Sequence, residues 1–319
     1  MNVTTMFENS EFALNFMKAA NVGLHSLFLI SVVLYLFVFP FYVYVFKLNK
    51  RRDKKTLLYP TVHHFYKIVK ISYCLFVSSM MFGKLAIHFS YKNGLICALC
   101  FAIAVVFIFT LYLLTEAFHL ITFLLALQRF LIYFFPPGAE KYVTAVQDFI
   151  NKQIWKLYLV MFLKEVVLII VYSLTEFNKE EGLTHFGIYF ITVVLVLYAL
   201  LFLSTVFYIP IIISARRLSH VDSAQQCMVQ KYIYWQTLTV FICKLQSVFL
   251  CIYLFIRASS ITDITFGIVL TDIVTTPLIV QIPYLGSNRW NSRRTTKFNW
   301  SMFFRVLFDI KKTSRVTHA

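Results

Sequence analysis

Two apolar runs constrain this chain more than any other feature of its sequence. Residues 22–46 and residues 186–213 contain no Asp, Glu, Lys or Arg, and a run of about 20 apolar residues is long enough to cross a bilayer as an α-helix. The composition agrees, because only 14% of the residues are charged, against roughly 25% in soluble domains. The sequence therefore predicts an all-α integral membrane protein.

Further apolar segments predict seven membrane-spanning helices within one transmembrane domain, residues 22–286. The expected spans cover about residues 22–46, 65–89, 95–135, 154–174, 186–213, 232–256 and 264–285. Residues 1–21 precede the first span, and residues 287–319 form a basic tail after the last. The predicted fold is a seven-helix bundle.

Basic residues predict the orientation of this bundle. The segment that follows the first span contains six positive residues and one negative residue, Asp53. The positive residues are Lys47, Lys50, Arg51, Arg52, Lys54 and Lys55. Such clusters are retained in the cytosol, so the N-terminus is expected outside and the C-terminus inside. This distribution accounts for the net charge of +16 without a nucleic-acid partner. In an outside N-terminus, Asn2 of the Asn2-Val3-Thr4 sequon is a candidate glycosylation site.

The tail contains a possible interfacial helix at about residues 298–311. Its apolar side chains recur at helical spacing, at Trp300, Phe303, Phe304, Leu307 and Ile310. This pattern is typical of a helix that lies on the inner leaflet, where the surrounding basic residues would attract anionic membrane lipid. A disordered basic tail is the alternative interpretation.

The third span carries a polar stripe. Tyr112, Thr115, His119, Thr122, Ala126 and Arg129 follow one another at spacings of three or four, which places them on one face of a helix. In lipid, a polar face is tolerated only toward protein or a wet cavity. We therefore expect this face to point into the bundle.

Ionisable residues inside the spans predict interhelical ion pairs, since an isolated charge in hydrocarbon costs several kcal/mol. The spans contain equal numbers of deep basic and acidic residues: three lysines (Lys84, Lys164, Lys244) and three acids (Glu116, Glu165, Asp272). Lys244 is expected to pair with Asp272, because the sixth and seventh helices are normally neighbours. Glu116 could pair with Lys164 or with Lys84. A packing role and a ligand contact are both open for these groups.

A ligand pocket is expected in the outer half of the bundle, with apolar walls and a few polar anchors. The candidate anchors are Lys84, His88, Tyr112, Glu116, Lys244 and Asp272. No spacing of Cys, His, Asp or Glu predicts a metal site, and no residue pattern predicts a cofactor. Motifs of hydrolases are also missing from the sequence, so no enzymatic function is predicted.

The inner end of the third span resembles a known receptor motif. Arg129 stands beside the aromatic Phe130, with Pro136 seven residues later, which is similar to the Asp-Arg-Tyr triplet and following proline of rhodopsin-like receptors. Three wider stretches resemble the nematode serpentine receptor class Z chemoreceptors: residues 118–136 (FHLITFLLALQRFLIYFFP), 140–143 (EKYV) and 271–281 (TDIVTTPLIVQ).

This resemblance implies a seven-helix, G-protein-coupled receptor of sensory cells, located in the plasma membrane. Such a receptor binds a small chemical cue outside the cell and a heterotrimeric G protein inside. The resemblance places Arg129, Phe130 and Pro136 on the side that faces the G protein. A membrane transporter or ligand-gated ion channel is the alternative, because buried lysines and carboxylates also line ion pathways. Gln128 stands where the rhodopsin-like triplet has its acid, so the resemblance does not imply an ionic lock at Arg129.

Overall fold

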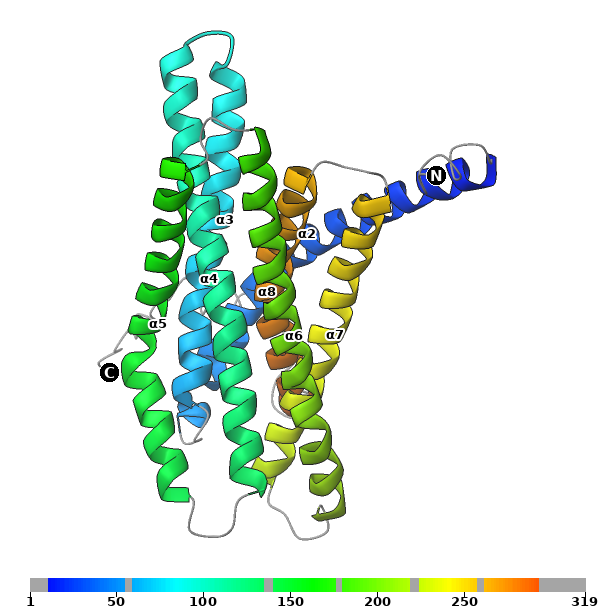
Figure 1. Ribbon diagram of the computed structural model, residues 1–319. Coiled ribbons are helices and arrows are strands. Elements are labelled where there is room, and N and C mark those ends of the chain that lie inside the picture. The colour runs from blue at the N-terminus through cyan, green and yellow to red at the C-terminus, as the bar shows by residue number, and fades with distance from the viewer. Residues whose placement is uncertain are drawn as a thin grey trace, which may run out of the picture.

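The computed structural model describes residues 11–54, 59–134, 140–175, 180–218, 224–256 and 261–292 (Figure 1). Asn2, Pro136 and the expected tail helix at residues 298–311 lie outside this described part. The backbone of Arg129 lies within a described helix, but its side chain lies outside the description. The predictions made for these positions stay predictions.

Seven helices make up the described residues, which contain no strand. They are α2 (Glu11–Asp53), α3 (Tyr59–Phe89), α4 (Gly94–Phe134), α5 (Glu140–Thr175), α6 (Glu180–Leu218), α7 (Ala224–Ile256) and α8 (Ile261–Ser292). Each predicted span falls on one of these helices in order. Most helices extend beyond their predicted spans, because the backbone hydrogen-bond ladder continues into polar flanks that hydropathy alone assigns to loops.

The turn between α3 and α4 shows how the sequence ends one helix and starts the next. The Asn93 side chain accepts hydrogen bonds from the backbone N–H groups of Leu95, at 3.1 Å, and Ile96, at 3.3 Å. Asn93 is therefore the N-cap of α4, since it satisfies N–H groups that have no partner within the helix. Its own N–H donates to the Phe89 carbonyl at 3.0 Å, which closes the end of α3.

Helix α4 holds the bundle together. It packs against α3, α5, α6 and α8, while α7 and α8 form a second extensive helix pair. Figure 1 shows α2 crossing the other helices at a steep angle, with its N-terminal end projecting from the bundle. The described members of the predicted stripe, from Tyr112 to Ala126, are buried, because α4 is enclosed by these neighbours along that face.

The surface of the bundle is apolar. Five helical segments are long and apolar enough to cross a membrane: Lys18–Arg51, Val62–Phe89, Gly94–Leu127, Gly187–Pro210 and Asp263–Ser287. Large side chains such as Phe37, Phe101 and Val160 are exposed by 68%, 62% and 59%. A soluble protein rarely exposes so much apolar surface, so these faces are suited to contact with lipid. The most buried of the five segments lies in α8 and is enclosed by other helices.

Candidate functional site

An ion pair joins α7 and α8 in the interior of the bundle. Lys244 Nζ lies 2.7 Å from Asp272 Oδ1, and the Tyr198 hydroxyl on α6 donates to the same oxygen at 2.6 Å. The lysine nitrogen also lies 4.5 Å from the centre of the Tyr198 ring, in a cation–π contact. The predicted Lys244–Asp272 pair is therefore present, and it ties three helices together.

A histidine of α4 extends this group toward the centre of the bundle. His119 Nε2 lies 3.2 Å from Thr276 Oγ1, one helical turn beyond Asp272 on α8. The His119 and Tyr198 rings also meet edge to face at 6.4 Å between centroids. We call Lys244, Asp272, Tyr198, His119 and Thr276 the central polar cluster. Its members come from α4, α6, α7 and α8, so the cluster connects four helices.

A second group of charges lies between α4 and α5. Lys164 Nζ contacts both carboxylate oxygens of Glu116, at 3.0 and 3.1 Å, and lies 2.7 Å from Glu165 Oε1. The Tyr112 hydroxyl donates to Glu116 Oε1 at 2.6 Å. Glu116 therefore pairs with Lys164 rather than with Lys84. Because two carboxylates share one lysine, these groups carry one negative charge in excess when all are ionised.

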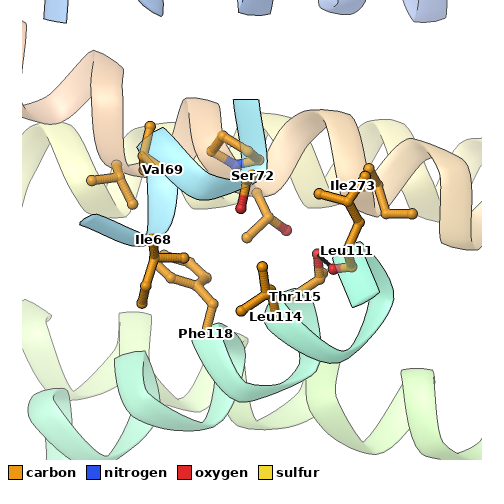
Figure 2. A pocket seen from close by; sticks show the side chains of 11 residues that line it. Ile68, Val69, Ser72, Leu111, Leu114, Thr115, Phe118 and Ile273 are labelled. Atoms are coloured by element: carbon orange, nitrogen blue, oxygen red, sulfur yellow. Dashed lines mark hydrogen bonds between the residues drawn. The ribbon is translucent and has the colours of Figure 1, made fainter. Parts of the chain in front are cut away.

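A small cavity lies beside the central polar cluster, between α3, α4 and α8 (Figure 2). Its walls are mostly apolar, with three hydroxyl-bearing residues among them: Ser72, Thr115 and Thr276. The space open to the centre of a water molecule is about 10 Å³, which is room for about one water. Thr276 belongs to both the cavity and the cluster, so a molecule in this cavity would touch the interior hydrogen-bond network.

A proline borders this cavity. Pro277 lies inside α8 and lines the cavity together with Ile273. Proline has no N–H group, so the Ile273 carbonyl four residues earlier loses its hydrogen-bond partner within the helix. Helices bend most readily at such positions. This segment of α8 is therefore the part of the cavity wall best suited to move.

The predicted ligand anchors divide into two groups. Tyr112, Glu116, Lys244 and Asp272 are buried and paired as described above, although none of them lines the cavity. Lys84 and His88 are exposed on α3, so the structure does not bring them to the other anchors. The reason is helical phase, because neighbouring Ala86 is the residue at this level of α3 that turns inward.

At the far end of α4, Phe130 lies in an aromatic contact between two helices. Its ring centre is 4.6 Å from that of Phe134 and 4.9 Å from that of Phe207 on α6. This contact joins α4 to α6 next to the backbone of Arg129. The G-protein-facing role predicted for Arg129, Phe130 and Pro136 stays a prediction.

The sequence alone did not single out Tyr198 and Thr276. Tyr198 lies within the uncharged run 186–213, where nothing distinguishes it from other aromatic residues. The available signal was indirect: a buried carboxylate such as Asp272 accepts more hydrogen bonds than one lysine supplies. An inward-facing hydroxyl on a neighbouring helix was therefore to be expected.

Residues 25–289 match the profile of a protein family described as "Serpentine type 7TM GPCR chemoreceptor Srz". The chain belongs to this family. The predicted class Z resemblance is thereby confirmed, and the matched range includes all five residues of the central polar cluster. Comparison with curated proteins and with solved structures gave no match. As an Srz chain with several long apolar helices, the protein is a multi-pass membrane protein of a chemoreceptor family.

Proposed function

We propose that this Srz protein is a chemosensory receptor, which binds a small chemical cue from outside the cell and signals through a heterotrimeric G protein inside. The plasma membrane of sensory cells is the proposed location. Family membership supports the receptor class. The single structural observation that carries the proposal is the central polar cluster, in which Lys244, Asp272 and Tyr198 link three helices and Thr276 lines the cavity.

The cue is proposed to act at the cavity through Thr276. As it stands the cavity has room for about one water, so a cue would occupy it only after the helices separate. Movement of α8 near Pro277 would widen the cavity and pull Thr276 away from His119, which lies 3.2 Å away. Binding to the wider arrangement would shift the population of receptors toward it.

The proposed output is an opening at the other end of the bundle. There Arg129 would reach backbone carbonyls of the G protein once α4 and α6 part, because a guanidinium group offers five donors in a fixed geometry. Separation of these helices would disrupt the contact between Phe130 and Phe207. The two ends are joined by α4 itself.

A cue screen in cells that express this chain, read out by second-messenger change, tests the proposed function. The wild-type receptor is expected to respond to at least one cue, and Arg129→Ala is expected to reach the surface without responding. An Arg129→Ala response equal to wild type would remove the G-protein-facing assignment. A transporter or ligand-gated channel is the second candidate, favoured by the buried charges, and cue-evoked current in bilayers containing only the purified protein would identify it.

A further inference from the structure

A concentration of positive charge lies where α2 ends and α3 begins. Lys50 near the end of α2, Lys54 directly after α2 and Lys67 of α3 lie close enough to His63 for their positive charges to act on its imidazole, and Phe46 of α2 stacks on that ring. All three lysines are exposed. We call Lys50, Lys54, Lys67 and His63 the basic corner. It lies at the opposite end of α3 from the Asn93 turn, on the side proposed to be cytosolic.

One carboxylate, that of Asp53, lies on the described part of these two helix ends. Asp53 lies between two of the lysines in sequence, but its Oδ2 accepts a hydrogen bond from the Tyr284 hydroxyl of α8 at 2.7 Å. Asp53 is thereby directed toward α8. Like charges repel one another, so a multiply charged anion bound among these three ammonium groups would lower their repulsion.

The backbone at this corner also favours an anion. Helix α3 begins at Tyr59. The first N–H groups of a helix have no partner within it and carry the positive end of the helix dipole, although Pro60 at the second position supplies no N–H. His63, on the second turn, stacks against Tyr59 at 5.4 Å and against Phe46 at 6.1 Å. Its buried Nδ1 has no hydrogen-bond partner in the described part of the chain. The ring is held by stacking.

The surface beside the basic corner is apolar, which favours a lipid over a soluble anion as the ligand. Leu48 of α2 is 42% exposed and Ile71 of α3 is 51% exposed, each within a few residues of a corner lysine. Acyl chains would cover these side chains while the lysines reach the headgroup level. A soluble phosphate compound would leave them uncovered.

We propose that the basic corner binds the phosphorylated headgroup of a phosphoinositide lipid. Three lysines match the several charges of a phosphorylated inositol, whereas phosphatidylserine carries a single net negative charge. The choice of the inner leaflet rests on the proposed function, in which the end of the bundle that contains Arg129 faces the cytosol. Lipid binding itself requires neither a cue nor a G protein, so the two proposals can fail separately.

The test is native mass spectrometry of the full receptor released from nanodiscs. The discs contain phosphatidylcholine with either phosphatidylinositol bisphosphate or phosphatidylserine. Wild type is expected to retain one phosphoinositide in preference to phosphatidylserine. The triple variant Lys50→Ala, Lys54→Ala, Lys67→Ala is expected to bind it at least about tenfold more weakly, since each lysine contributes roughly a factor of several near an anionic headgroup.

A matched control removes the same number of charges at the other end of the bundle. Lys18, Lys84 and Lys92 are exposed, and the triple variant Lys18→Ala, Lys84→Ala, Lys92→Ala should bind phosphoinositide as wild type does. Equal binding by both triple variants would overturn the proposal. So would equal retention of phosphatidylserine, or equally tight binding of soluble inositol trisphosphate in discs of phosphatidylcholine alone. If the corner triple variant does not fold, Lys67→Ala alone should weaken binding several-fold.

Discussion

Lys244 on α7 and Asp272 on α8 form an ion pair inside the bundle, 2.7 Å apart, with side chains exposed by 0% and 8%. Such a pair is costly to desolvate, and it is far more costly to leave one partner alone. The packing of α7 on α8 is therefore expected to be sensitive to substitution of either residue.

The first prediction concerns the two halves of this pair. Lys244→Met leaves the Asp272 carboxylate buried without its cation, and is expected to lower stability by about 3 to 5 kcal/mol. The doubly reversed receptor, Lys244→Asp with Asp272→Lys, should recover part of this loss and restore surface delivery. Thermal midpoints of detergent-solubilised variants and surface labelling measure both effects. Additive losses in the double variant would mean that the two residues do not act as a pair.

Tyr198 provides a second prediction. Tyr198→Phe removes the hydroxyl that donates to Asp272 at 2.6 Å but keeps the ring that faces Lys244. The expected loss is about 1.5 to 3 kcal/mol, the range for a hydrogen bond to a charged group. Tyr91→Phe is the control, since Tyr91 is 98% exposed. Thermal midpoints that agree between the two variants would show that the Tyr198 hydroxyl adds nothing to the ion pair.

The α4–α5 charges predict opposite outcomes for two substitutions. Glu165→Gln leaves Lys164 paired with Glu116 at 3.0 Å, so the group becomes neutral overall and stability should be unchanged or slightly higher. Lys164→Met leaves two carboxylates without a cation, and should lower stability by several kcal/mol. Denaturation midpoints in the same detergent rank the two variants. A Glu165→Gln receptor less stable than Lys164→Met contradicts this charge balance.

Alanine substitutions at two glycines test how closely α7 packs against α8. A Cβ atom on Gly286 of α8 would lie 3.0 Å from ring atoms of Trp235 on α7, whereas a Cβ on Gly83 of α3 would meet nothing within 4 Å. Gly286→Ala is therefore expected to destabilise by about 1 to 3 kcal/mol through overpacking. Gly83→Ala should stabilise by up to about 1 kcal/mol through helix propensity. Thermal midpoints that move in the same direction by the same amount would contradict the close approach of α7 and α8.

Much of this architecture could be predicted from the sequence, because hydrophobic length and the cost of buried charge act locally. Apolar runs locate the helices, and an aspartate and a lysine on neighbouring helices imply the Lys244–Asp272 pair. Their third partner, Tyr198, was not predictable in the same way, since its role depends on how α6 rotates relative to α8. Periodicity along one helix carries no information on that rotation.

The position of the cavity also could not be predicted from the sequence. A pocket in the outer half, near Lys84 and His88, was the expectation, whereas the observed cavity lies at the level of Ser72 and Thr276. A cavity is the space that three packed helices fail to fill, so its position depends on side-chain volumes from all three. The lengths of the helices were underestimated for a different reason. The backbone hydrogen bonds of a helix continue into the polar residues beyond its apolar segment, and α2, for example, ends only at Asp53.

The orientation of the chain is the claim on which the cue site, the G-protein-facing end and the basic corner all depend. The most direct measurement attaches a small epitope tag to each end of the chain and stains intact and permeabilised cells with antibodies. Seven crossings with an outside N-terminus predict that the N-terminal tag is stained on intact cells, and the C-terminal tag only after permeabilisation. Staining of both tags under the same condition, or of the C-terminal tag alone on intact cells, would contradict the account.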